Sequence, residues 1–200
     1  NTGFSDSRQF SIGARGDLGI KQSMPIVNLA WANFLFWDGR SKSLEEQAND
    51  PITNPIEMAS TSFDEIIAKL EKDKKFASDF KKVYPDGLTE ANITDAIEEF
   101  ERTLITPDSR FDKWLRGDDS ALTADELAGY QLFKEYDCAT CHVGPNLGGQ
   151  SYELMGLRRH YFADRGLELT VEDNGRFKET QLERDRHRFK VPGIRNIEHT

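Results

Sequence analysis

The most informative stretch of this sequence is Cys138-Ala139-Thr140-Cys141-His142, which contains both cysteines of the chain. Its C-x-x-C-H spacing is the attachment signature of c-type haem. Two thiols at this spacing reach the two vinyl groups on one edge of the porphyrin, and the imidazole that follows turns onto the iron. The sequence therefore predicts one covalently bound haem c, held by Cys138, Cys141 and His142.

A C-x-x-C pair has two other interpretations, a thioredoxin-like redox site and half of a zinc site. A redox pair follows a strand and opens a helix, whereas residues 124–136, just before Cys138, have the pattern of a helix. A zinc site needs further ligands at short spacing, and the remaining histidines are scattered, at His160, His187 and His199. Haem is favoured over both. Because haem c is attached outside the cytoplasm, we expect a periplasmic or other extracytoplasmic location.

Composition limits the partners that this protein can have. The chain of 200 residues is 37% hydrophobic and 30% charged, with a net charge of −9 at pH 7. An acidic surface repels phosphates, so nucleic acid is not expected as a partner. No stretch approaches the ~18 consecutive apolar residues that span a bilayer, so no transmembrane segment is expected. The low apolar fraction predicts a well-solvated surface and a core supplied in part by a cofactor.

Capping residues and apolar periodicity predict a mainly helical fold. Capping boxes start helices at Ser62 and Thr123, and Thr89 caps a third. The expected elements are a short helix at 44–48, a proline-containing loop at 49–57, helices at 63–70, 76–84, 90–104, 111–115 and 124–136, and a loop-rich segment at 143–200. The buried stripe of the helix after Thr89 is predicted to be Ile93, Ile97, Phe100 and Leu104.

The segment around Thr106-Pro107-Asp108 ends one helix and is the expected domain boundary. We therefore expect two cytochrome c-like helical domains with long loops, at 1–106 and 107–200. An aromatic run at 31–37 precedes Asp38-Gly39-Arg40. Such a run either packs in a core or walls a flat cofactor, and both interpretations stay open. Asp38 and Arg40 are expected to fix the turn by a local ion pair.

Several short motifs share an order and spacing along nearly the whole chain. They are Phe36-Trp37-Asp38-Gly39-Arg40, Glu46-Gln47-Ala48, Ile56-Glu57-Met58, Leu104-Ile105-Thr106-Pro107-Asp108, Phe111-Asp112-Lys113, the C-x-x-C-H segment, Gly175-Arg176-Phe177, and Val191-Pro192 with Arg195-Asn196. Together they resemble the bacterial dihaem cytochrome c peroxidases and the related dihaem oxidases of methylamine utilisation. The resemblance implies an N-terminal domain with a peroxidatic haem and a C-terminal domain with an electron-transfer haem.

The resemblance implies a role for each matching residue. The haem on Cys138, Cys141 and His142 is the electron-transfer haem. Glu57 is the distal acid–base group. From the residues alone, an acid in a proline-bounded loop between two apolar neighbours is either a carboxyl with a raised pKa or an exposed loop glutamate. Gln47 is the second distal group, which hydrogen-bonds bound peroxide or water. From the residues alone it could instead be a solvent-facing helix residue.

The same resemblance makes Trp37 the tryptophan between the two haems, a role compatible with core packing. The expected activity is the reduction of hydrogen peroxide to water, with electrons from a small cytochrome c or a cupredoxin. The family commonly forms homodimers, so a homodimer is expected here. The alternatives are a dihaem oxidase that acts on a partner protein, and a monohaem electron-transfer protein with a degenerate first domain.

Three positions depart from the family pattern. The peroxidatic haem's own C-x-x-C-H is absent from this sequence, so we expect the chain to be shortened at both ends. Ala14 stands where the typical members carry a histidine that caps the resting peroxidatic iron, which predicts a protein that needs no reductive activation. The family also binds calcium between its domains. Its ligand positions correspond to Gln22, which replaces an asparagine, and Thr200, so calcium is only a weak expectation.

Overall fold

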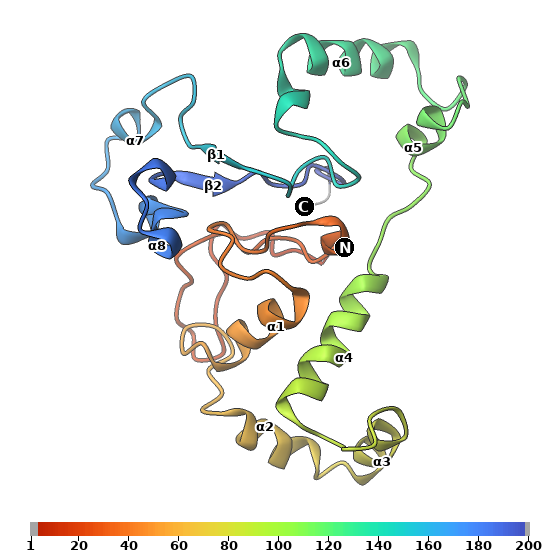
Figure 1. Cartoon of the computed structure of the whole chain (residues 1–200), viewed down its shortest axis with the longest axis vertical. Helices are drawn as coiled ribbons and strands as arrows, with labels where there is room; N and C mark the ends of the chain where they lie inside the picture. The colour runs from red at the N-terminus through yellow and green to blue at the C-terminus, as the bar shows by residue number, and fades with distance from the viewer. Residues whose placement is uncertain (1–3, 199–200) are drawn as a thin grey trace.

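The computed structural model describes residues 4–198, and in this part of the chain helices and loops dominate (Figure 1). The helices are α1 (Leu44–Thr53), α2 (Phe63–Leu70), α3 (Lys74–Val83), α4 (Glu90–Thr103), α5 (Arg110–Leu115), α6 (Ala124–Glu135), α7 (Tyr161–Asp164) and α8 (Phe177–Thr180). Short 3-10 turns lie at Leu29–Trp31, Cys138–Thr140, Val171–Asn174 and Glu183–Asp185. Strands β1 (Tyr152–Leu154) and β2 (Arg188–Lys190) pair antiparallel, with Tyr152 opposite Lys190. The predicted mainly helical class is confirmed.

Local capping explains where the helices begin. Ser62, Thr89 and Thr123 each accept a hydrogen bond from the backbone N–H three residues later, as the sequence predicted. Asp73 caps α3 and Ser109 caps α5 in the same way. Each cap satisfies a backbone donor that the first helical turn leaves without a partner.

The predicted loop at 49–57 is wrong in its first half, because α1 continues through Pro51 to Thr53. Proline lacks the N–H that a helix interior uses, so local propensity favours a break here. The helix continues because Ile52, only 6% exposed, packs with Phe63 and Ile93 in the core. Burial of an isoleucine side chain contributes ~1.5–3 kcal/mol, which is enough to offset much of the proline penalty.

The predicted stripe of α4 is also partly wrong. Ile93 is buried and Ile97 packs against the same core cluster, but Phe100 is 55% exposed. Glu101 is buried in its place. The face that packs on α1 and on the turn Leu29–Trp31 therefore follows positions 93, 97 and 101, a spacing of four residues. The sequence did not predict Glu101 on this face because charged side chains are seldom buried.

The N-terminal segment lies beside the C-terminal part of the chain at the centre of the molecule (Figure 1). Helices α2 and α3 form one end, α4 runs along one side, and α5 and α6 continue from it to the opposite end. The backbone N–H of Lys190 donates to the carbonyl of Trp37 at 2.8 Å, and the N–H of Gly149 donates to Val191 at 2.7 Å. Within residues 4–198, no helix is both long enough and apolar enough to cross a membrane.

Candidate functional site

A cavity of about 820 Å³ opens between the N-terminal segment, α1 and the stretch around α8 and β2. Its size is typical of sites for small molecules and cofactors, which measure ~300–1,000 Å³. Glu57, Gln47, Trp37 and Gln22 all line it. The fold thus brings together four predicted site residues that are spread over 36 positions of the sequence.

Gln47 projects from α1, and its side-chain oxygen Oε1 is buried without a hydrogen-bond partner among the described residues. Buried polar atoms are nearly always hydrogen-bonded, and leaving one unpaired costs ~1–3 kcal/mol. An acceptor in this position suits a bound molecule that carries an O–H group. Because Oε1 is buried, this atom of Gln47 does not face solvent.

Glu57 follows α1 in a turn, and its backbone N–H donates to the carbonyl of Asn54 at 3.1 Å. Its own carbonyl accepts the N–H of Ala14 at 2.7 Å, so the 11–18 loop packs directly on the Glu57 segment. Partial burial raises the pKa of the Glu57 carboxyl, the negative charge of Asp50 raises it further, and Arg40 opposes both. A carboxyl of this kind takes up and releases a proton more readily near neutral pH than an exposed glutamate does.

Trp37 is held by its backbone and by its ring. Its indole Nε1–H donates to the carbonyl of Gln22 at 2.9 Å, and its own carbonyl accepts the N–H of Lys190. The Arg40 guanidinium stacks over the neighbouring Phe36 ring, 3.4 Å from the ring centroid. The aromatic run therefore forms part of a cavity wall as well as part of the packed interior.

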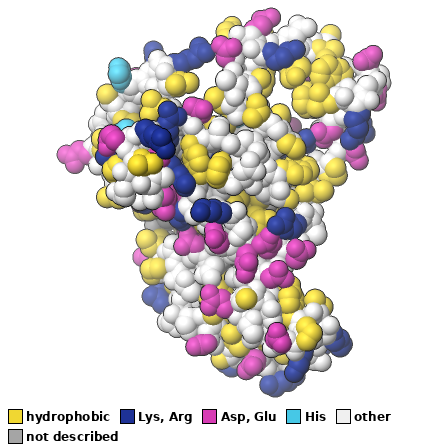
Figure 2. All heavy atoms as spheres, in the orientation of Figure 1, with side chains coloured by type: hydrophobic (Ala, Val, Ile, Leu, Met, Phe, Trp, Pro, Cys, Tyr) yellow, Lys and Arg dark blue, Asp and Glu magenta, His cyan; other side chains and the backbone are white. Residues whose placement is uncertain are grey.

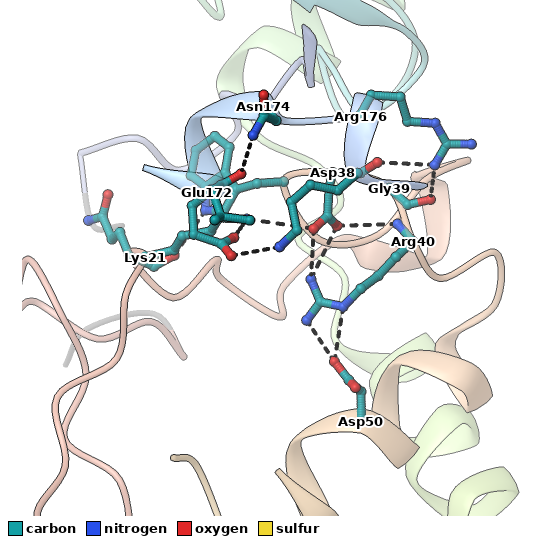
Figure 3. Close-up of polar contacts among 12 residues, drawn as sticks. Lys21, Asp38, Gly39, Arg40, Asp50, Glu172, Asn174 and Arg176 are labelled. Carbon is teal, nitrogen blue, oxygen red and sulfur yellow. Dashed lines mark hydrogen bonds and ion pairs between the residues drawn. The ribbon is translucent and has the colours of Figure 1, made fainter. Parts of the chain in front are cut away.

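A network of ion pairs supports this wall (Figure 3). Asp38 is 1% exposed and binds the guanidinium of Arg40 at 3.1 Å, which confirms the expected local pair. Arg40 also binds Asp50 at 2.6 Å, which places a second carboxylate beside Glu57. The Asp38 carboxylate further meets Lys21 at 3.5 Å.

Contacts from the C-terminal part of the chain complete the network. Lys21 binds Glu172 at 2.6 Å, and Arg176 donates to the carbonyls of Asp38 and Gly39 at 3.0 and 2.7 Å. The sequence analysis missed Lys21, Asp50 and Glu172. Only Asp50 carried a local signal, because it lies ten residues after Arg40 on what proved to be a continuation of α1.

The first three residues of the C-x-x-C-H segment, Cys138–Thr140, form a 3-10 turn shortly after the end of α6. Cys138 and Cys141 are free, half-buried thiols. The Nδ1 atom of His142 lies 2.9 Å from the carbonyl of Leu147, so Nδ1 carries the proton and Nε2 is left to bind a metal. Two thiols and an oriented imidazole on one turn fit a haem c, and no side chain of this turn lines the 820 Å³ cavity.

Apolar side chains next to this turn present a surface that a flat porphyrin would cover. Leu132, Tyr136 and Val143 are between 42% and 66% exposed. Figure 2 shows hydrophobic side chains gathered over the region of α5 and α6. Across residues 4–198, no cluster of three or more His, Cys, Asp or Glu side chains has the geometry to hold a metal ion.

The predicted calcium ligands are Gln22 and Thr200. Gln22, whose side chain would be one ligand, lines the cavity, and Thr200 lies outside the described residues. Calcium takes six to eight oxygen ligands.

Comparisons with known proteins show which family the chain belongs to. A family model described as di-haem cytochrome c peroxidase matches residues 1–120. The "Cytochrome c peroxidase Ccp" of Escherichia coli K12 is 53% identical over 197 residues, covering 98% of this chain and 42% of that protein. The "Cytochrome c551 peroxidase" of Nitrosomonas europaea is 44% identical, covering 99% of this chain and 58% of that protein.

The fold matches a solved structure of a MauG-like protein associated with microbial copper homeostasis, with a TM-score of 0.85 and 28% identity. That match covers all of this chain and 62% of the other. The chain thus spans about half the length of the curated relatives that it matches. On the family model and these identities, the chain belongs to the di-haem cytochrome c peroxidase family.

Proposed function

We propose that this chain is part of a haem-dependent peroxidase that reduces hydrogen peroxide to water. The observation that supports the proposal most directly is that Gln47, Glu57 and Trp37 share one cavity, with the Gln47 acceptor unpaired and the pKa of Glu57 raised. A plain electron carrier has no need of a buried hydrogen-bond acceptor beside a carboxyl with a raised pKa.

The proposed chemistry assigns one task to each side chain. A haem bound in the cavity would supply the iron centre for cleavage of the O–O bond. The Glu57 carboxylate takes the proton from the near oxygen of peroxide and returns it to the far oxygen, which leaves as water. The Gln47 Oε1 accepts a hydrogen bond from peroxide and orients it. The balance is one peroxide, two electrons and two protons for two waters.

Electrons are proposed to enter at the haem on Cys138, Cys141 and His142, and to reach the cavity past Trp37. The donor is a small cytochrome c or a cupredoxin. The two centres are proposed to belong to domains 1–106 and 107–200, since α4 ends at Thr103 and α5 begins at Arg110. On the resemblance to the family, we also propose a periplasmic location, a second haem c, a homodimer, and a calcium ion at Gln22 and Thr200.

The test uses the full-length secreted protein, matured with haem, and the substitution Glu57→Gln. Loss of the acid–base group is expected to lower kcat with peroxide ~10²–10⁴-fold. The exposed Glu71, at the end of α2, provides the matched control E71Q, which is expected to keep full activity. In the unmodified protein, the acidic limb of kcat/KM is expected above the ordinary glutamate pKa of ~4.3, because the Glu57 base is inactive once protonated.

Three results would contradict the proposal. An E57Q protein as active as E71Q would remove Glu57 from the chemistry. One haem per full-length chain, measured as a pyridine haemochrome, would favour the monohaem electron carrier. Oxidation of a partner protein in preference to peroxide turnover with a cytochrome donor would favour the dihaem oxidase of the methylamine-utilisation type.

A further inference from the structure

Lys190, the last residue of β2, is a buried cation that the proposed chemistry does not use. It is 3% exposed, and its backbone N–H is fixed by the Trp37 carbonyl. Lys190 lines the same cavity as Gln47 and Glu57. Lysine is almost never fully buried unless its charge is paired.

No hydrogen bond or ion pair joins the Lys190 ammonium to any side chain of residues 4–198. Burial accordingly lowers the pKa of Lys190 to about 8, and no carboxylate raises it again. An ammonium in this state is stabilised strongly by an anion that enters the cavity, because charge-assisted hydrogen bonds are roughly twice as strong as neutral ones.

The other cations on the cavity wall already have partners. Lys21 binds Asp38 and Glu172, and Lys178 binds Glu172 at 2.6 Å. Arg40 binds Asp38 and Asp50. Within the described part of the chain, Lys190 is therefore the cavity cation whose charge is left for a ligand.

We propose that the Lys190 ammonium binds a carboxylate of the porphyrin that occupies this cavity. The inference rests on the proposed function for the presence of haem there. A porphyrin is a flat apolar ring with carboxylates on one edge. The cavity offers apolar walls and, where β2 borders it, an unpaired cation. Lys190 thus joins strand β2, through one residue, to both the cofactor and the Trp37 backbone.

Lys190 is in this account a positioning residue. Its positive charge near the ring favours the reduced state of the iron, because the ferrous centre carries one positive charge fewer than the ferric centre. A carboxylate held in this way also fixes the rotation of the ring in the cavity relative to Gln47 and Glu57.

The test compares Lys190→Gln and Lys190→Arg in the full-length haem-loaded protein. K190Q is expected to shift the equilibrium of one haem toward the ferric state by about tenfold, which is 59 mV for one electron, in a spectroelectrochemical titration. It is also expected to shift that haem's propionate bending band in the resonance Raman spectrum. K190R keeps the charge and is expected to restore both signals. Lys82, which is paired with Asp79 on α3, provides the matched control K82Q, with neither change expected.

An unchanged potential and an unchanged propionate band in K190Q would overturn the inference. If K190Q fails to load haem, K190R is expected to load it, and equal failure of both also overturns the inference. Loss of stability with unchanged haem spectra would indicate instead an acidic side chain elsewhere in the protein as the partner. None of these readouts needs turnover, so a protein with the K190Q shift but no peroxidase activity would keep this inference while refuting the proposed function. A protein without haem refutes both.

Discussion

Removing the Arg195 guanidinium is expected to separate three segments that it holds together. Arg195 donates two hydrogen bonds to the carboxylate of Asp112 on α5. It also donates to the carbonyls of Pro145, just after the haem motif, and of Thr106, at the proposed domain boundary. The two ion-pair side chains are only 13% and 14% exposed. The substitution Arg195→Met keeps an unbranched apolar stem and removes every one of these donors.

The size of the effect follows from that burial. Removing one partner of a buried ion pair costs ~3–5 kcal/mol, because the other charge is left uncompensated. Because Arg195 and Asp112 keep a small solvent access, the expected loss in the free energy of unfolding lies just below that range, at ~2–3 kcal/mol. The double variant R195M/D112N is expected to lose less than the sum of the two single variants, since no unpaired charge remains.

Chemical denaturation of the full-length protein, followed by circular dichroism, measures these differences. The hydrogen bonds from Arg195 hold the pKa of Asp112 well below its usual range. A depressed pKa stabilises the fold above the unfolded value of ~3.9, and that stabilisation is lost as the pH falls toward the folded value. The gap between the unmodified protein and R195M is therefore expected to narrow below about pH 4. An R195M protein within ~0.5 kcal/mol of the unmodified protein at pH 7 would refute the reasoning.

Two further predictions concern the 11–18 loop. A Cβ on Gly13 would lie 1.7 Å from the carbonyl oxygen of Ile56, so Gly13→Ala is expected to push the loop off the Glu57 segment, at ~1–3 kcal/mol and with a higher KM for peroxide. Gly19→Ala, whose Cβ would meet Ser11 at an ordinary 3.4 Å, is the control, and equal thermal denaturation of the two variants would contradict the first prediction. Ala14 lines the cavity without a ligating atom, so the oxidised protein is expected to react with peroxide without prior reduction, and Ala14→His is expected to create that requirement. A six-coordinate, bis-histidine peroxidatic haem in the oxidised unmodified protein would rule this out.

The features that the sequence predicted correctly depend on neighbours along the chain. The turn that begins at Cys138 is specified by consecutive residues of the C-x-x-C-H segment. The helix starts at Ser62, Thr89 and Thr123 each depend on a hydrogen bond to an amide three residues away. The Asp38–Arg40 pair spans two residues. The family motifs likewise predicted site roles for Glu57, Gln47 and Trp37. The structure has all three lining one cavity.

The failures occurred where a distant contact outweighed a local preference. Pro51 signals a break, yet α1 continues past it because Ile52 is buried against α2 and α4. Phe100 has the apolar spacing of a core residue, but on its side of α4 the described residues leave it 55% exposed.

The sequence by itself determined the C-x-x-C-H turn, the helical class and the family, because these depend on short spacings and on the order of motifs. Only the tertiary structure decided which charges are left without partners. Lys21 and Lys190 look alike in the sequence, but one is neutralised by carboxylates from two distant segments and the other is buried facing a cavity with no counter-charge. Electrostatic interactions act through space and strengthen as water is excluded, so the state of each charge depends on the packing of segments that are far apart in the chain.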